Sequence, residues 1–144
     1  MGQSNLERKI IKAMDNNPIG SLATVEGKLP RNRYMMLFHD GLTVYMATDK
    51  KTHKVEELEE NPNVHLLFGM EKEIVSLEGT CTISDDKDLR HKLWNKEFEN
   101  WYSGPDDPDY VVLVVEPSRI EYSLNSEENT EMEVWEAEKS KQLQ

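Results

Sequence analysis

Between residues 19 and 122, short runs in which apolar residues alternate with polar ones are separated by turn residues. An alternation of period two places the apolar side chains on one face, so each such run predicts a half-buried β-strand. Seven segments alternate in this way or are wholly apolar: 19–25, 30–38, 42–48, 64–70, 74–84, 110–115 and 119–122. Six or seven strands joined by short turns predict an antiparallel barrel, because closure removes exposed sheet edges.

Three other segments are predicted to be short helices. Residues 5–16 place apolar side chains at helical spacing after a capping box. Thr52–Glu60 is expected to be a helix that is capped by the Thr52 hydroxyl and ended by a following Asn-Pro pair. A third helix is expected up to about Phe98, with Asp85 or Asp86 as its cap. The chain is therefore expected to be mostly β with short helices.

The 144 residues fit one domain, which we expect to span residues 1–123. Residues 124–144 contain six Glu and two Lys, a net charge of −4, and are interpreted as an acidic tail that is disordered or partly helical around Met132–Lys139. The whole chain has a formal charge of −11. Such a surface repels phosphate backbones, so a nucleic-acid partner is not expected. An anionic ligand would need a local cluster of positive charge.

Several features predict a cytoplasmic protein. No apolar run approaches the roughly 20 residues of a membrane helix, and the first residues lack the apolar core of a secretory signal. The single cysteine, Cys81, cannot form an internal disulfide. The four histidines lie on different predicted elements and do not form a metal-ligand set. We therefore expect no membrane partner and no metal.

Basic and hydroxyl residues gather where the strand ending at Thr48 passes into the helix beginning at Thr52. Asp40-Gly41 predicts a two-residue type I′ turn, a register that places Arg33 opposite Thr48 and about 5 Å away. A helix N-terminus adds unpaired N–H groups and partial positive charge. The set predicts a site for a phosphate monoester, formed by Arg33, Thr48, Thr52 and Lys54. On the residues alone, an equal alternative is that Thr52 only caps the helix and the lysines face solvent.

The order of residues over 5–122 resembles the pyridoxamine 5'-phosphate oxidase-like family, and within it the small bacterial general stress proteins. The similarity lies in the run Gly41–Thr48, in the segments 76–79, 89–94, 102–108 and 111–115, and in Thr52, Lys54, Val55, Leu58, Asn61-Pro62, Val64 and Phe68. The resemblance implies a split β-barrel that forms a homodimer with FMN at the subunit interface.

The resemblance also implies roles for individual residues. The FMN phosphate would be held by Arg33, Thr48, Thr52 and Lys54, with Lys51 as a further candidate. The strand residues beside the isoalloxazine ring would be Tyr34, Met35 and Met36, together with Arg33. Two tryptophans are candidates for a contact with the flavin or with the second subunit. Trp94 is expected instead to pack the helix over 87–98 onto the core, and Trp101 is the better candidate for contact across the dimer.

The function implied is that of an FMN-dependent oxidoreductase with a small-molecule redox substrate, linked to the general stress response. Two alternatives are a non-catalytic flavin-binding protein, used for storage or redox sensing, and a barrel that has lost its cofactor. Oxidases of pyridoxamine phosphate carry an aromatic pair and basic residues near the C-terminus. Here residues 121–124 are Glu-Tyr-Ser-Leu and no Arg follows. Activity on pyridoxamine phosphate is therefore not expected, and no catalytic side chain is predicted.

Overall fold

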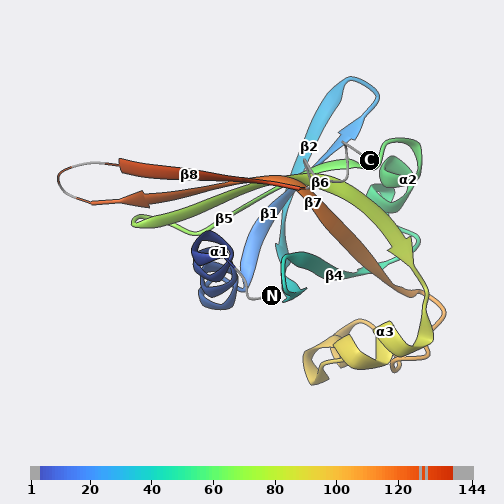
Figure 1. Ribbon diagram of the computed structural model, residues 1–144. Helices are drawn as coiled ribbons and strands as arrows, with labels where there is room; N and C mark the ends of the chain where they lie inside the picture. The colour runs from blue at the N-terminus through green and yellow to red at the C-terminus, as the bar shows by residue number, and fades with distance from the viewer. Residues whose placement is uncertain (1–3, 127, 129, 138–144) are drawn as a thin grey trace, which may run out of the picture.

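The computed structural model describes residues 4–126, 128 and 130–137, and strands predominate in it. They form one sheet in the order β2-β1-β5-β6-β7-β4-β3, with β8 also paired to β7. The sheet curls into a half-barrel (Figure 1). The strands are β1 Ile19–Glu26, β2 Leu29–Met36, β3 Phe38–Asp40, β4 Thr43–Asp49, β5 Asn63–Phe68, β6 Glu73–Ser84, β7 Tyr110–Asn125 and β8 Thr130–Glu136. The helices are α1 Asn5–Asn16, α2 His53–Glu60, α3 Lys87–Leu93 and the 3-10 helix η1 Lys96–Asn100.

The long pairing of β6 with β7 includes every residue of β6. Its register shifts between Glu78 and Gly79, where Ser118 is the extra residue of a β-bulge on β7. The Ser118 hydroxyl donates to the Glu78 carbonyl at 3.1 Å. A Cβ at Gly79 would collide with the carbonyl oxygen of Glu116, so the two strands can approach this closely only because residue 79 is glycine. The bulge bends the ladder and contributes to the curl of the sheet.

Helix α1 covers part of the sheet, as predicted from its apolar spacing. Ile10, Ala13 and Met14 are buried in the main core of the half-barrel. The N-terminus of α1 is capped by Ser4, whose hydroxyl accepts a hydrogen bond from the Glu7 N–H at 3.1 Å. The Glu7 carboxylate accepts a hydrogen bond from the indole N–H of Trp135, so α1 also contacts β8.

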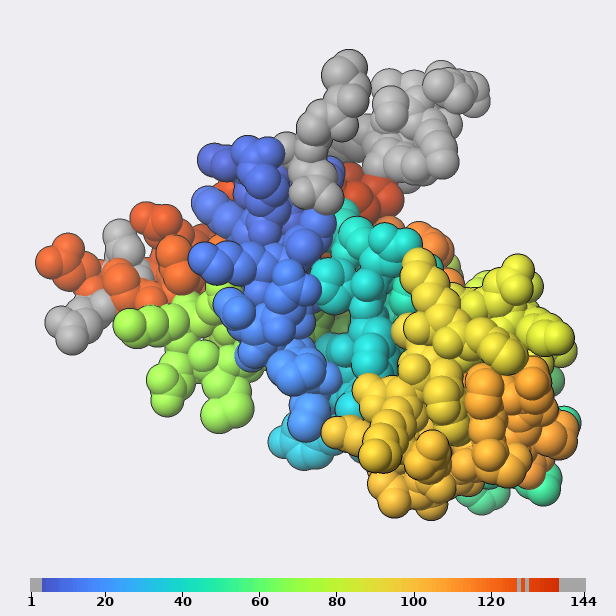
Figure 2. Space-filling view, turned by 90° about the horizontal axis from the view of Figure 1, so that it is seen from below, coloured from blue at the N-terminus to red at the C-terminus, as the bar shows by residue number. Residues whose placement is uncertain are grey.

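A second, aromatic core lies beneath α3 and η1. Phe98, Tyr110 and Val112 are buried there, and Trp94 packs edge-on against both Phe98 and Tyr110. The predicted core role of Trp94 is therefore confirmed. Figure 2 shows β3 and β4 (cyan) between α1 (blue) on one side and the α3 segment (yellow) on the other. This second core fixes the α3 segment beside β4.

The predicted pairing of segment 30–38 with segment 42–48 is wrong. β2 pairs instead with β1, so that Arg33 lies opposite Leu22 and not opposite Thr48. The reason is the two-residue turn between these two strands, which folds β2 directly back onto β1. One edge of β2 is therefore paired with β1. Of the predicted segment 30–38, only Phe38, the first residue of the short β3, pairs with β4.

The turn between β3 and β4 is also displaced by one residue from the prediction. Asp40 pairs with Thr43, so the central residues are Gly41 and Leu42. Gly41 has a φ of +61°, whereas Leu42 has no positive φ. A type I′ turn requires positive φ at both central positions, and leucine disfavours it.

Two further predictions differ from the structure at the C-terminal end. The segments 110–115 and 119–122 form one strand, β7, because the bulge accommodates Pro117 without ending the pairing. The expected helix around Met132–Lys139 is wrong for its described part, which lies in strand β8. Met132 and Val134 alternate with acidic residues, a period that suits an edge strand better than a helix. Residues 138 and 139 of that prediction lie outside the described part of the chain.

The third predicted helix is shorter than expected. Asp86 caps α3 by accepting a hydrogen bond from the Leu89 N–H at 3.0 Å, as one of the two predicted caps. The helix ends at Leu93, and η1 continues after a break. Among the described residues no helix is long and apolar enough to span a membrane.

The bulge leads to a prediction about stability. Gly79→Ala should lower the free energy of unfolding by at least about 2 kcal/mol, because its Cβ would collide with the Glu116 carbonyl. Gly104→Ala is the matched control, since a Cβ there meets nothing within 4 Å. It should be neutral or stabilise by up to about 1 kcal/mol through the unfolded state. Urea unfolding of both variants measures the difference, and equal effects would contradict this account of the bulge.

Candidate functional site

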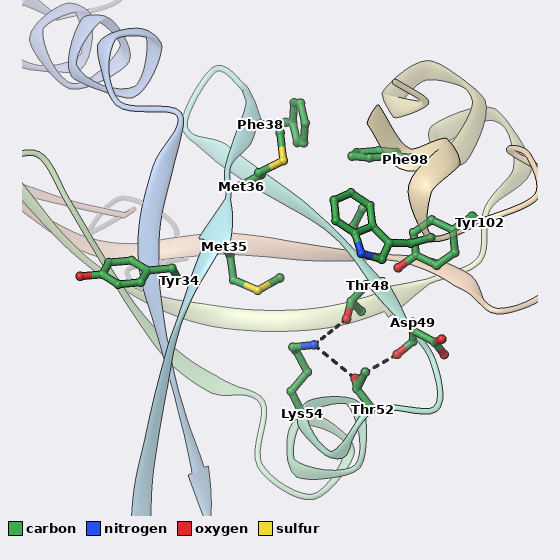
Figure 3. Close-up of a pocket in the computed structure, with 12 residues that line it drawn as sticks. Tyr34, Met35, Met36, Phe38, Thr48, Asp49, Thr52, Lys54, Phe98 and Tyr102 are labelled. Carbon is green, nitrogen blue, oxygen red and sulfur yellow. Dashed lines mark hydrogen bonds between the residues drawn. The ribbon is translucent and has the colours of Figure 1, made fainter. Parts of the chain in front are cut away.

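A pocket of about 350 Å³ opens where β2, β4, the start of α2 and the segment after α3 meet (Figure 3). Its two ends differ in chemistry: one carries hydroxyls and a lysine, and the other is apolar and aromatic. The residues that line it are Tyr34, Met35, Met36, Phe38, Ala47, Thr48, Asp49, Thr52, Lys54, Phe98, Trp101 and Tyr102.

Lys54 lies at the centre of the polar end. Its ammonium donates to the Thr48 hydroxyl at 2.8 Å and to the Thr52 hydroxyl at 3.4 Å (Figure 3). Thr48 is the buried penultimate residue of β4, and Thr52 immediately precedes α2. The Thr52 hydroxyl donates to the Asp49 carbonyl at 2.9 Å and makes no cap hydrogen bond to α2, so the predicted capping by this hydroxyl is wrong.

The charge of Lys54 is not compensated by contact with a carboxylate. Within the described part of the chain, its ammonium takes part in no ion pair. Burial, and then the nearby charge of Arg33, hold the pKa of Lys54 below its ordinary value of 10.5. A half-buried cation whose contacts are hydroxyls is a favourable place for an anion.

The opposite end of the pocket is formed by apolar and aromatic side chains. Met35 points into the pocket from β2, whereas Tyr34 points away from it and is 82% exposed (Figure 3). Phe98 packs edge-on against Phe38 with ring centroids 5.9 Å apart. Trp101 lines the pocket and is 67% exposed. This wall suits a flat apolar ring better than a second charged group.

Tyr102 adds a polar atom to the aromatic wall. Its ring packs on Tyr110 with centroids 5.2 Å apart. Burial, followed by the negative charges of Asp49, Asp107 and Asp109, raises the pKa of its hydroxyl to about 12. The Tyr102 hydroxyl is therefore protonated near neutral pH and can donate a hydrogen bond within the pocket.

The structure brings most of the predicted site residues together. The predicted residues that line the pocket are Tyr34, Met35, Met36, Thr48, Thr52, Lys54 and Trp101. Arg33 and Lys51 do not line it. Lys51 instead forms an exposed ion pair with Asp109 at 3.1 Å, and this hydrogen bond raises the pKa of the lysine.

Arg33 lies behind the pocket, in a polar cluster between β1, β2 and α2. One terminal nitrogen donates to the Thr24 hydroxyl at 2.8 Å and to the Leu22 carbonyl at 3.2 Å. The other contacts the Glu57 carboxylate at 3.3 Å. Thr24 and Glu57 are both buried, and the Thr24 hydroxyl donates to Glu57 at 2.6 Å.

Five further residues that line the pocket were not predicted from the sequence. These are Phe38, Ala47, Asp49, Phe98 and Tyr102. Ala47 and Asp49 flank the predicted Thr48, and Tyr102 follows the predicted Trp101, so proximity in the sequence was the available signal. Phe38 and Phe98 meet only through the aromatic core, which no local pattern reveals.

Comparisons with known proteins identify the family of the chain. The family model described as pyridoxamine 5'-phosphate oxidase matches residues 6–124. General stress protein 26 of Bacillus subtilis (strain 168) is 42% identical over 135 residues, covering 90% of this chain and 96% of that protein. The crystal structure of General Stress Protein 26 from Bacillus anthracis is 35% identical with a TM-score of 0.79, covering 83% of this chain and 94% of that one.

A more distant structure shares the fold alone. It is a pyridoxamine 5'-phosphate oxidase-related, FMN binding protein from Nostoc punctiforme, with 17% identity and a TM-score of 0.70 over 94% of this chain and 99% of that one. Together with the half-barrel sheet, these matches confirm the split-barrel fold expected from the resemblance. The chain therefore belongs to the pyridoxamine 5'-phosphate oxidase-like family, in the branch that includes general stress protein 26.

Proposed function

We propose that this protein binds FMN in the pocket of Figure 3, with the phosphate of the cofactor at Lys54. The observation that carries the proposal is the half-buried ammonium of Lys54, which contacts hydroxyls and no carboxylate among the described residues. A phosphate would accept its N–H groups as charge-assisted hydrogen bonds. The Thr48 hydroxyl donates to no group in the described part of the chain and can donate to the phosphate as well, whereas Thr52 already donates to a carbonyl.

The rest of the pocket fits the flavin ring. Met35, Met36 and Phe98 offer apolar surface to a flat aromatic group, and Trp101 offers a ring at the exposed side. β2 lies at one end of the sheet order and pairs only with β1 in the described structure. Its other row of backbone N–H and C=O groups, including those around Tyr34, is therefore available to the polar edge of the isoalloxazine.

Of the other two predicted phosphate residues, Arg33 adds positive charge at longer range, whereas Lys51 lies outside the pocket and is not part of the proposed phosphate set. Arg33 would act through its charge, which is felt at Lys54 although its side chain is bound to Glu57. Lys51 would have to leave Asp109 before it could reach a ligand.

We propose that the protein is an FMN-dependent oxidoreductase of the general stress response, acting on a small-molecule redox substrate. A bound flavin supplies the hydride or electron chemistry, while the protein binds and orients it. The protonated Tyr102 hydroxyl is the donor that the chain itself offers within the pocket. A second candidate is a flavin store or redox sensor, which is favoured by a pocket whose lining residues include no His, Cys or Glu.

The C-terminal strands argue against pyridoxamine phosphate as the substrate. Arg119 is bound to Glu121 at 2.6 Å, on β7. Tyr122 is buried, and its hydroxyl donates to Glu73 at 3.0 Å. Neither the basic residue nor the aromatic residue of this segment is thus free to hold a second phosphate ligand.

We further propose that the protein works in the reducing cytosol. Cys81 is buried, and burial raises the pKa of its thiol to about 12. A protonated and enclosed thiol neither links two chains nor acts as a nucleophile. The cysteine therefore serves as a small core residue, and an unbridged core thiol is what a reducing compartment favours.

The proposed assembly is a homodimer with FMN at the interface. Tyr34 and Trp101 border the pocket with exposed aromatic rings, and Ile19, Leu67 and Met70 leave apolar surface exposed beside a second hollow near Tyr34. Exposed apolar surface that is contiguous with a ligand pocket is typical of an interaction site. A second subunit placed there would cover both the rings and the open side of the pocket.

The first prediction concerns the cofactor. Protein that is incubated with FMN and freed of excess should keep about one flavin per chain, seen as the two visible absorption bands of the oxidised ring. Lys54→Met should weaken FMN binding by about one to two orders of magnitude, because charge-assisted hydrogen bonds are lost. Riboflavin, which lacks the phosphate, should bind both proteins equally.

Lys51→Met is the matched control for this experiment. It removes the same charge three residues away, from a side chain that is paired with Asp109 outside the pocket. Its effect on FMN binding should stay below about threefold. Equal losses in the two variants would contradict the phosphate assignment, and a wild-type protein that retains no flavin would contradict the cofactor.

Steady consumption of NAD(P)H by the loaded protein would decide against the storage function.

The second prediction concerns pH. The charged groups that act on Lys54 are Arg33 of β2, Asp49 of β4 and Glu57 of α2, and the pKa of the free ammonium lies below 10.5. A bound phosphate dianion would raise that pKa, so binding takes up a proton between the free and bound values. The ratio of FMN affinity to riboflavin affinity should therefore fall as the pH rises through the free pKa of Lys54. In Lys54→Met the ratio should not change with pH over this range.

The third prediction concerns assembly. Sedimentation analysis should give the mass of two chains, and Leu67→Lys should shift the protein towards the mass of one, because it places a charge on the proposed interface. Leu29→Lys is the control: Leu29 is 60% exposed, at the tip of the β1–β2 hairpin. A monomeric wild type, or dimers that survive Leu67→Lys unchanged, would overturn this choice of surface.

A further inference from the structure

Glu57 is a buried carboxylate that the proposed FMN site does not use directly. It lies on α2, one helical turn after Lys54, and is 7% exposed. It accepts hydrogen bonds from the Thr24 hydroxyl at 2.6 Å and from Arg33 at 3.3 Å. Burying a charge is costly unless it is paired and hydrogen-bonded. An apolar residue at this position could pack α2 against the sheet without that cost.

The partner of Glu57 is Arg33, which lies outside the pocket in the same polar cluster. Arg33 donates to the Thr24 hydroxyl, the Leu22 carbonyl and the Glu57 carboxylate, so its guanidinium is fixed on the β1 side of the cluster. Its positive charge nevertheless acts on the Lys54 ammonium. Glu57 offsets that charge, because its carboxylate contacts the Arg33 guanidinium at 3.3 Å.

The other charges around the pocket are balanced in the same way. Lys51 is paired with Asp109, and the Asp49 carboxylate lines the pocket on the same side as Lys54. A phosphate dianion would therefore meet the positive charge of Lys54 and the negative charge of Asp49. The charge of Arg33 is already offset by Glu57. The site recognises an anion mainly by the desolvated ammonium and its hydroxyl neighbours and has little excess positive charge.

We propose that Glu57 is a positioning residue that holds Arg33 and limits the positive charge of the phosphate site, and thereby limits the preference of the pocket for FMN over riboflavin. The inference rests on the proposed function, because it concerns the affinity of the same pocket. It also assigns a use to the buried Arg33–Glu57 pair beyond packing.

Glu57→Gln tests this inference, because glutamine keeps the shape and the hydrogen-bonding oxygen but removes the charge. The ratio of FMN affinity to riboflavin affinity should rise by about threefold to tenfold, while riboflavin affinity itself stays constant. Flavin fluorescence measured at equilibrium gives both affinities. Glu56→Gln is the matched control, since Glu56 precedes it on α2, is 77% exposed and does not contact Arg33. It changes the net charge equally and should leave the ratio within twofold of the wild type.

A second pair of variants keeps the test decisive if Glu57→Gln folds poorly. Arg33→Met alone leaves the Glu57 charge unpaired and should lower the FMN-to-riboflavin ratio by about tenfold. Adding Glu57→Gln to Arg33→Met removes both charges and should return the ratio to within threefold of the wild type. This recovery would show that the Glu57 charge, and not the fold of α2, sets phosphate affinity.

The possible outcomes separate the two proposals. A wild-type protein that binds FMN no more tightly than riboflavin contradicts the proposed phosphate site, and this inference with it. A wild type that prefers FMN, combined with an unchanged or lowered ratio in Glu57→Gln, overturns the inference alone. In that case Glu57 is a structural support of α2 and does not limit the charge of the site.

Discussion

The ladder between β6 and β7 is the interaction on which the architecture depends, because its bulge divides β7 into two halves that pair with different strands. Before the bulge, Tyr110–Val115 pairs with β4 on the edge opposite β6. After it, Arg119–Asn125 pairs on that edge with β8. One continuous strand thus carries two different neighbours, which diverge from each other (Figure 1). This divergence is what leaves the barrel split, and Gly79 permits it by letting the Glu116 carbonyl come close.

The pocket proposed to bind FMN is a consequence of that split. β2 lies at one end of the sheet order, β4 lies near the other, and the curl of the sheet brings them into contact without joining them by a ladder. The pocket opens along this seam, between the 34–36 part of β2 and the 47–49 part of β4. A closed barrel would have paired these edges and filled the space. The seam instead leaves backbone groups of β2 unpaired beside a lysine at the start of α2.

The accuracy of the sequence-based predictions follows the range of the interactions involved. Thr48, Thr52 and Lys54 lie within seven residues, so the strand end and the helix start position them together, and they could be predicted. The position of Arg33 depended on strand pairing, which alternation alone does not specify, since β2 could face β1 or β4 equally well. The strand β8 was missed because its acidic composition hides a period-two pattern, and because its anchor, the bond from Trp135 to Glu7, spans nearly the whole chain.

The electrostatics of the site follow from burial more than from the number of charges. The chain carries a formal charge of −11, and each of the cations Arg33 and Lys51 contacts a carboxylate. Lys54 differs because the seam half-buries it, and its hydrogen-bond partners among the described residues are hydroxyls. Its pKa is therefore lowered in the free protein, which means that part of its solvation has been lost before any ligand arrives. An anion that enters the seam would restore to the Lys54 ammonium the stabilisation that burial removed. A protein with a strongly acidic surface could in this way still bind a phosphate group at this one site.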